Sequence, residues 1–547
     1  MVIHQNLIIM LSFLFGYCFA GNLLTVETQG GKVRGFYKQT VKSKRYIAFE
    51  GIPYAKPPIG NLRFEPPQPF GKWNGVLNAN TTYICSQVLF VQNLKLGQED
   101  CLYLNVYVPK ETIDANANLS VIVNIHGGSF MILSAKLGAG EDFVMDRDVI
   151  YVNLNYRLGV LGFLSTDDET VPGNMGLKDQ NVAMKWVKDN IKYFGGNPDS
   201  ITLIGCSAGG ASVHYHYLSP LSRGKGLFHR GMSQSGTTFN TWAFIQKPKE
   251  RLTVLANHLN CSQMSGKTVI DCLKYLPVKD ILKAQMKLFK VASTYPTTLF
   301  GPVIDKGPNA FLPDHPYKLI SSGNFTQVPW ITSNTIDEGV YPILPIVILN
   351  KLQEFDEKWN DQLPYVLNYA QSANKTDWPI ISKKIRDYYL EDKPATRALS
   401  ELVKLCSDRY FLYDTYRALK LHTQNSVAPV YYYRYSFDDG IPTMGVKGVA
   451  HADDSKIVFR MINVSRKLPE KTAAMRDTLL DMIYNYATTG KPTINNQEFP
   501  AFKKSAGSLL INIKSSNSVT IEKFKELESD SFWYKLPIIE NEKLFTS

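Results

Sequence analysis

The stretch that decides the fold is Ile201-Thr202-Leu203-Ile204-Gly205-Cys206-Ser207-Ala208-Gly209, in which a short apolar run leads into the pattern G-x-S-x-G. An apolar run of this length is typical of a buried strand, and residues 208–218 that follow are typical of a helix. A serine on the sharp turn between such a strand and such a helix presents its Oγ above the sheet, where it can act as a nucleophile. The sequence therefore predicts a nucleophilic Ser207, and an ordinary glycine-rich turn is the alternative reading of the pattern.

Further strands and helices lie on both sides of this turn. Apolar strands that alternate with helices indicate a mainly parallel sheet covered on both faces, with its chemistry at the carboxyl ends of the strands. Together with the turn at Ser207, the pattern predicts one catalytic domain, residues 21–547, with the α/β-hydrolase fold. We expect large helical insertions over the active site, in the segments 237–325 and 340–427. The predicted strands span 121–125, 149–154, 201–204, 328–332 and 430–435, and the predicted helices span 182–194 and 208–218.

A second glycine-rich loop, His126-Gly127-Gly128, follows the strand predicted over 121–125. Attack of a serine on a carbonyl group places negative charge on the oxygen, and preorganised backbone N–H groups stabilise that charge. One donor is expected to be the N–H of Ala208, the residue after the nucleophile. The others are expected to come from Gly127 and Gly128, because a side chain there would block the substrate.

A serine nucleophile of this kind needs an acid and a histidine base, in the chain order serine, acid, histidine. His451 lies in a loop after the strand predicted over 430–435 and is the predicted base. Asp337 and Glu338 follow the strand predicted over 328–332, and these residues alone do not decide which carboxylate is the acid. The other histidines after Ser207 that we considered have no comparable setting: His214, His216 and His422.

The N-terminal segment, residues 1–20, is largely apolar and contains no Lys, Arg, Asp or Glu. Its apolar stretch, residues 7–19, is short for a bilayer span, and Ala20 suits cleavage by a signal peptidase. No later stretch is long and apolar enough for a membrane helix, and the last residues carry neither a hydrophobic tail nor a retention signal. We therefore expect residues 1–20 to be a signal peptide and the mature chain to be extracellular, without a membrane anchor.

Six cysteines remain after residue 20, and six cysteines allow fifteen complete pairings. The short spacings favour the disulfides Cys85–Cys101 and Cys261–Cys272 and leave Cys206 and Cys406 reduced. Disulfides and glycans both fit an exported chain. Six Asn-x-Ser/Thr sequons are candidate glycosylation sites: Asn80, Asn118, Asn260, Asn324, Asn374 and Asn463.

The net charge of +11 comes from basic residues in short, dispersed groups. No basic stripe with interleaved aromatic side chains is present, so a nucleic acid partner is not expected. No clustered His, Cys, Asp or Glu spacing indicates a metal site, and no cofactor is expected. The sequence leaves the oligomeric state open.

The chain resembles the type-B carboxylesterases, and among them the insect E4-type and venom carboxylesterases, over nearly the whole of residues 21–547. The insect resemblance lies in the segment 212–221, which follows the serine turn. The motifs that carry the family resemblance include Phe49-Glu50-Gly51-Ile52-Pro53-Tyr54-Ala55, Asn155-Tyr156-Arg157-Leu158-Gly159, Gly173-Asn174-Met175-Gly176-Leu177-Lys178-Asp179-Gln180 and Phe194-Gly195-Gly196-Asn197-Pro198.

This resemblance implies a serine carboxylesterase that hydrolyses small hydrophobic esters through an acyl-enzyme and is inhibited by organophosphates. It implies Glu338 rather than Asp337 as the acid, His451 as the base, and Gly127 and Gly128 in the oxyanion hole. It also implies the two disulfides that the cysteine spacings favour.

The residue before the nucleophile departs from the family, which often has Glu where this chain has Cys206. A neutral thiol cannot replace that charge, and we expect altered specificity with activity retained. Two other functions stay open: a juvenile-hormone-type esterase of narrower specificity, and a non-catalytic binding protein similar to the neuroligins. A cholinesterase is disfavoured, because the loop between Cys85 and Cys101 contains Phe90 but no Trp to bind a quaternary ammonium group.

Overall fold

The computed structural model describes residues 24–89, 94–262, 267–292, 294–391, 393–461, 464–505 and 507–539. The expected signal peptide, residues 1–20, and Phe90 lie outside these residues. No helix within the described ranges is both long enough and apolar enough to cross a membrane.

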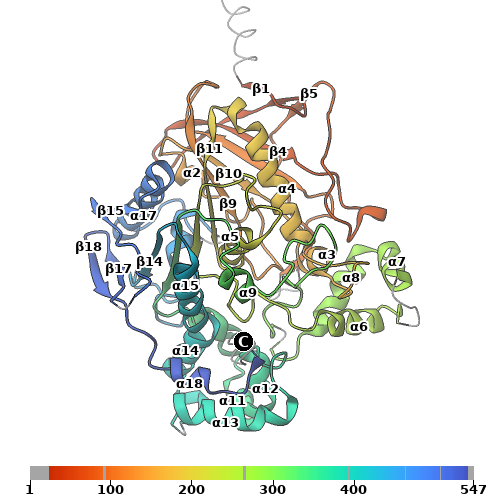
Figure 1. The fold of residues 1–547 in the computed structure, drawn as a ribbon, viewed down its shortest axis with the longest axis vertical. Helices are drawn as coiled ribbons and strands as arrows, with labels where there is room; N and C mark the ends of the chain where they lie inside the picture. The colour runs from red at the N-terminus through yellow and green to blue at the C-terminus, as the bar shows by residue number, and fades with distance from the viewer. Residues whose placement is uncertain are drawn as a thin grey trace, which may run out of the picture.

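An eleven-stranded sheet runs through the centre of the described chain (Figure 1). Its middle strands, from β17 to β10, pair in parallel, and both of its edges are antiparallel. This architecture confirms the predicted mainly parallel sheet. The strands in spatial order are β18 (Ser518–Lys523), β17 (Leu509–Ser515), β14 (Val430–Tyr435), β13 (Trp330–Thr335), β12 (Arg230–Gln234), β11 (Gly196–Cys206), β9 (Leu119–Ile125), β10 (Ile150–Leu154), β8 (Tyr103–Val108), β4 (Arg45–Pro53) and β3 (Phe36–Gln39).

Both faces of the sheet are covered by helices, because the strands carry apolar side chains on both sides. Successive residues of a strand point to opposite faces, and Leu203 and Ile204 of β11 accordingly belong to different core clusters. The cluster with Leu203 contains α4 (Met175–Asn190) and α5 (Ala208–Leu218). The cluster with Ile204 contains α17 (Glu470–Thr489). A strand buried on both faces is an unbroken apolar run, which is the signal seen at residues 201–204.

Helix α4 begins at Met175, earlier than the predicted start at 182, and continues into the 3-10 turn η2 (Ile191–Phe194). The first turns of α4 contain buried polar residues with buried partners: Asp179 pairs with Arg157 at 2.7 Å, and Lys178 pairs with Asp305 at 2.9 Å. These charges interrupt the apolar periodicity, so the sequence pattern did not reveal the start of the helix.

The two predicted insertions are largely helical, with α6–α8 on one flank of the molecule and α11–α14 gathered at one end (Figure 1). Helices α14 and α15 are joined by a π-helical turn, η6 (Asp408–Leu412). The insertion helices are α6 (Pro248–His258), α7 (Lys267–Tyr275), α8 (Val278–Gln285), α9 (Pro316–Ser321), α10 (Val340–Ile348), α11 (Leu352–Glu357), α12 (Trp359–Val366), α13 (Trp378–Tyr389), α14 (Leu399–Ser407) and α15 (Tyr413–Asn425). Shorter elements elsewhere include β1 (Thr25–Glu27), β2 (Lys32–Arg34), β5 (Val76–Asn78), α2 (Glu141–Val144), α3 (Gly159–Phe163), α16 (Asp453–Val458) and α18 (Asp530–Tyr534).

Candidate active site

Ser207 occupies the sharp turn between β11 and α5, where the sequence places it. Its backbone has φ 59° and ψ −124°, a conformation that residues other than glycine rarely adopt. Such strain costs about 1–3 kcal/mol and persists only where the surroundings impose it. The N–H of Ser207 donates to the carbonyl oxygen of Gln234 at 2.8 Å, and a Cβ on Gly209 would lie only 2.0 Å from the oxygen of Ile125. The neighbouring strands therefore hold the turn in place.

The loop after β9 lies directly against this turn. A Cβ on Gly127 would lie 2.6 Å from the carbonyl oxygen of Cys206 and 3.1 Å from Cβ of Ser207. Ala208 is the first residue of α5, so its N–H has no acceptor within the helix. The structure thus brings Gly127 and Ala208, two residues of the predicted oxyanion hole, next to Ser207, with Gly128 following at φ 97°.

His126, which precedes these glycines, is buried and holds the loop. Its ring stacks on Tyr156 at 4.4 Å between centroids, and the Tyr156 hydroxyl donates to the carbonyl oxygen of His126 at 3.0 Å. Burial lowers the pKa of His126 to about 4, so the ring is neutral near pH 7.

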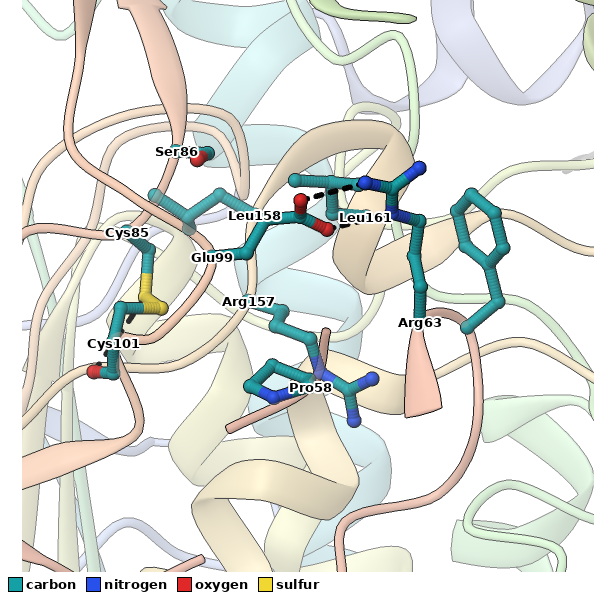
Figure 2. A pocket seen from close by; sticks show the side chains of 10 residues that line it. Pro58, Arg63, Cys85, Ser86, Glu99, Cys101, Arg157, Leu158 and Leu161 are labelled. Carbon is teal, nitrogen blue, oxygen red and sulfur yellow. Dashed lines mark hydrogen bonds and ion pairs between the residues drawn. A yellow bond between two sulfur atoms is a disulfide. The ribbon is translucent and has the colours of Figure 1, made fainter. Parts of the chain in front are cut away.

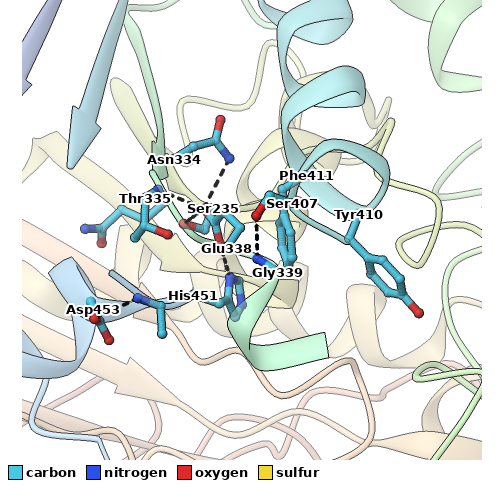
Figure 3. A network of polar contacts seen from close by, with 12 residues as sticks. Ser235, Asn334, Thr335, Glu338, Gly339, Ser407, Tyr410, Phe411, His451 and Asp453 are labelled. Atoms are coloured by element: carbon cyan, nitrogen blue, oxygen red, sulfur yellow. Dashed lines mark hydrogen bonds and ion pairs between the residues drawn. The ribbon is translucent and has the colours of Figure 1, made fainter. Parts of the chain in front are cut away.

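Glu338 and His451 are in direct contact (Figure 3). Oε2 of Glu338 lies 2.6 Å from Nδ1 of His451, which places the imidazole proton on Nδ1 and leaves Nε2 as an acceptor. Glu338 is fully buried, and its Oε1 accepts hydrogen bonds from the Ser235 hydroxyl at 2.6 Å and the Thr335 N–H at 2.9 Å. Because these donors satisfy the buried carboxylate, its orientation toward the imidazole is fixed.

Asp337, the other candidate acid, makes a different contact. Its Oδ2 accepts a hydrogen bond from the N–H of Val449 at 2.9 Å. Burial raises the pKa of Asp337. Of the two adjacent carboxylates, Glu338 therefore contacts the side chain of the predicted base. Asp337 instead accepts a hydrogen bond from the backbone of the loop that carries His451.

Two residues at the end of β12 connect the serine turn to the acid. Gln234 accepts the N–H of Ser207, and the next residue, Ser235, donates its hydroxyl to Glu338. The segments that carry Ser207, Glu338 and His451 follow β11, β13 and β14, whose carboxyl ends share one edge of the sheet. Ser235 was not among the predicted site residues, because strand β12, which precedes it, was not among the predicted strands.

Aromatic rings flank the imidazole of His451. The ring of Phe411, in the turn η6, lies 4.5 Å from that of His451 between centroids, and Figure 3 shows Tyr410 directed away from this site. The ring of Tyr341 lies 5.6 Å from that of His451, and Tyr341 is 48% exposed. π-helical turns often occur at functional sites, but no sequence signal marked Phe411. Two aromatic rings therefore form part of the surroundings of the base.

Cys206, the residue that departs from the family pattern, is a buried free thiol. Burial, together with the charge of Asp454, raises its pKa well above the ordinary value. Asp454 is itself fully buried and accepts hydrogen bonds from the Tyr433 hydroxyl at 2.7 Å and the Gln234 amide at 3.2 Å. The residue before Ser207 therefore carries a neutral, buried thiol near Asp454. The hydrogen bonds of Asp454 connect α16 to the ends of β12 and β14.

The three histidines that were not assigned to catalysis, His214, His216 and His422, are buried in the core. The burial of His422 could not be predicted from the polar residues that flank it in the sequence. Nε2 of His214 lies 3.2 Å from Nδ1 of His422. Both rings stack on Trp330, at 4.4 Å and 4.5 Å between centroids. His216 contacts Ser222 and Gln180, so all three histidines support packing rather than the site.

Both disulfides favoured by the cysteine spacings are present, Cys85–Cys101 and Cys261–Cys272. Cys206 and Cys406 are free and buried. Five sequon asparagines have exposed positions, and the sixth, Asn463, lies outside the described residues. The exposed ones are Asn80, Asn118, Asn260, Asn324 and Asn374.

A small cavity lies beside the Cys85–Cys101 disulfide (Figure 2), and its lining includes none of Ser207, Glu338 and His451. Its volume is about 10 Å³, the size of one water molecule. Arg63 lines it, pairs with Glu99 at 2.6 Å and also donates to the carbonyl oxygen of Leu276 at the end of α7. This arrangement joins the Cys85–Cys101 loop to the region of the second disulfide, and the cavity is too small for a substrate.

Known proteins are similar to this chain over most of its length. The model of the Carboxylesterase family matches residues 22–533. The chain is 37% identical to venom carboxylesterase-6 of Apis mellifera, over 94% of this chain and 95% of that protein. It is 35% identical to esterase E4 of Myzus persicae, over 89% and 90%.

A solved structure shares the fold. It is the juvenile hormone esterase of Manduca sexta with OTFP covalently attached, which matches with a TM-score of 0.80 and 26% identity, over 93% of this chain and 98% of that chain. This match confirms the predicted α/β-hydrolase fold.

Proposed function

This chain belongs to the carboxylesterase family and is a carboxylic ester hydrolase, and on that premise we propose that it is a secreted serine esterase that cleaves hydrophobic esters through an acyl-enzyme on Ser207. The observation that carries the proposal is the contact between Glu338 and His451, which Ser235 and Gln234 connect to the turn of Ser207. The aromatic rings of Phe411 and Tyr341 beside the base favour apolar substrates.

In the first half of the reaction, Oγ of Ser207 attacks the ester carbonyl carbon while Nε2 of His451 takes the hydroxyl proton. The backbone N–H groups of Gly127, Gly128 and Ala208 stabilise the negative oxygen of the tetrahedral intermediate. The bond from the carbonyl carbon to the alcohol oxygen then breaks, and His451 donates its proton to the departing alcohol. Glu338 stabilises the imidazolium during this exchange.

In the second half, a water molecule replaces the alcohol. His451 takes a proton from the water, the hydroxide attacks the acyl carbon, and the bond to Oγ of Ser207 breaks as the serine recovers its proton. The products are a carboxylic acid and free enzyme. Organophosphates should inhibit, because they react with the same activated Oγ.

The test uses a fluorophosphonate probe and the variant Ser207→Ala. We expect the probe to label the peptide that contains Ser207, and Ser207→Ala to lose both labelling and hydrolysis of a nitrophenyl ester while its Tm stays near that of the wild type. The variant Ser400→Ala, at an exposed serine, is the matched control and should keep both activities. Retained hydrolysis in Ser207→Ala would refute the acyl-enzyme assignment.

Secretion is part of the proposal and rests on the N-terminal segment and on the exposed sequons at residues 80, 118, 260, 324 and 374. Expression with residues 1–20 in insect cells should deliver a glycosylated esterase, beginning near residue 21, to the medium. Recovery of the protein only inside the cells would contradict this location.

A juvenile-hormone-type esterase is the second candidate, favoured by the match to the Manduca sexta structure. The ratio of kcat/KM for juvenile hormone to kcat/KM for a nitrophenyl ester distinguishes this candidate from a broad esterase. A broad esterase predicts comparable values, and a hormone esterase predicts a strong preference for the hormone. The presence of Ser207, Glu338 and His451 argues against a non-catalytic binding protein.

A further inference from the structure

Two carboxylates hold the backbone immediately before His451. Oδ2 of Asp337 accepts a hydrogen bond from the N–H of Val449 at 2.9 Å, and Oδ2 of Asp453 accepts one from the N–H of Ala450 at 2.9 Å. These are consecutive N–H groups, and the next residue is His451. Asp337 comes from the loop that carries Glu338, and Asp453 is the first residue of α16, so the base lies between two fixed segments.

The contact with Asp337 is closely fitted. The N–H of Asp337 donates to the carbonyl oxygen of Val449 at 3.1 Å, so the two residues exchange hydrogen bonds. Gly448 has φ 134°, and a Cβ at this position would lie 2.9 Å from Oδ2 of Asp337. A side chain at this position would displace the carboxylate and would be strained at this φ, so glycine favours the close approach of the base loop to the acid loop.

The contact of Asp453, marked by a dashed line in Figure 3, is supported by a second interaction of the same carboxylate. Oδ1 of Asp453 pairs with Lys456, one turn further along α16, at 2.7 Å. The side chain of Asp453 is only 12% exposed. Residue 452, between His451 and Asp453, has φ 69°, so the chain turns sharply before the helix begins. The carboxylate thus ties the start of α16 back to the peptide group before the base.

Both carboxylates are partly removed from water. Burial raises the pKa of Asp453 to about 6 and also raises the pKa of Asp337. The charged groups that face Asp453 are Lys456 and Asp439, and Asp438 faces Asp337. An ionised carboxylate in such surroundings lowers the stability of the fold. Residues that lower stability in this way are typically kept where their geometry serves function.

We propose that Asp337 and Asp453 are positioning residues that form a clamp on the peptide groups of Val449 and Ala450 and so hold the imidazole of His451 in register with Glu338. This inference rests on the proposed serine esterase function. A misplacement of about 1 Å between reacting groups can cost about 100-fold in rate, so the backbone of the base needs its own support.

The test compares alanine and asparagine at each position. Alanine removes the acceptor, and we expect Asp337→Ala and Asp453→Ala to lower kcat about ten-fold while KM changes less than about two-fold. Asparagine keeps an acceptor oxygen, so Asp337→Asn and Asp453→Asn should recover most of the lost kcat. The rate of fluorophosphonate labelling of Ser207 should follow kcat, because labelling needs the same base.

Asp438→Asn is the matched control, because this exposed aspartate undergoes the same change of charge near Asp337 and should keep the wild-type kcat. Alanine variants with kcat within two-fold of wild type, or asparagine variants no better than alanine, would overturn the clamp. If an alanine variant does not fold, the asparagine variant at that position decides: a kcat within three-fold of wild type supports the clamp, and a ten-fold fall overturns it. Ser207→Ala, measured alongside, tests the proposed function separately.

Discussion

Oε2 of Glu338 lies 2.6 Å from Nδ1 of His451, and the carboxylate that makes this contact is fully buried. The other oxygen of Glu338 accepts hydrogen bonds from Ser235 and Thr335, so the carboxylate cannot turn away from the imidazole without leaving donors unpaired. This arrangement fixes the imidazole tautomer and explains why the adjacent Asp337, although of the same chemistry, has a different role.

Replacement of Glu338 by glutamine should lower kcat by about 10³- to 10⁴-fold with little change in KM, because the amide group can stabilise the wrong imidazole tautomer and carries no charge. Steady-state kinetics on a nitrophenyl ester provide the measurement. Glu354→Gln, at a carboxylate of α11 that pairs with surface lysines, is the control and should behave as wild type. A Glu338→Gln enzyme within ten-fold of wild type would show that the contact does not orient the base.

Gly127→Ala should lower kcat by about 10²- to 10³-fold, the usual cost of losing an oxyanion donor. The added Cβ would approach the oxygen of Cys206 to 2.6 Å, so the loop must move away from the serine turn. Gly138→Ala in the same loop region is the control, since a Cβ there meets nothing within 4 Å. Equal activities of the two variants would contradict the assignment of Gly127 to the oxyanion hole.

Cys206 should resist alkylation in the folded enzyme, although it adjoins the nucleophile. Its pKa is raised by burial, and only the thiolate reacts quickly. Mass spectrometry after iodoacetamide treatment should find Cys206 and Cys406 unmodified in the native protein and modified in guanidinium chloride, with Ser207-dependent activity unaffected in the native sample. Rapid native labelling at Cys206 with loss of activity would show an accessible, reactive thiol instead.

Stability should fall as the pH decreases below about 6.5, before most carboxylates are protonated. Burial lowers the pKa of His214 and of His216 to about 3 and lowers that of His422 well below its ordinary value of 6.5. The unfolded chain therefore binds protons that the folded chain excludes, and the stabilisation present above pH 6.5 is lost on acidification. Each such imidazole accounts for about 2 kcal/mol at pH 5.

Urea unfolding at a series of pH values between about 5 and about 7.5 measures this dependence. His422→Leu should reduce the number of protons taken up on unfolding by about one near pH 5. His258→Leu, at an exposed position of α6, should leave that number unchanged. A pH dependence that is the same in His422→Leu and in the wild type would indicate that the buried pair does not control acid stability.

Local patterns in the sequence predicted the elements that carry the site. Helix α5 over Ala208–Leu218 and strand β14 over Val430–Tyr435 agree with the predicted ranges, because each has an apolar pattern long enough to specify its own secondary structure. Strand β11 contains the predicted range 201–204 but is longer, from Gly196 to Cys206. The start of α4 was missed, because its first turns hold charged residues whose partners, Arg157 and Asp305, are distant in the sequence.

The sequence by itself determined the type of chemistry: a serine turn, a glycine-rich loop and a late histidine, each recognisable from its neighbours along the chain. Only the tertiary structure decided which atoms meet. The pairing of Glu338 with His451, the support from Ser235, the ring of Phe411 beside the base and the contact of Asp337 with Val449 all join residues that are distant along the chain. The physical reason is that burial and hydrogen-bond partners depend on how the strands and insertions pack, which no short stretch of sequence specifies.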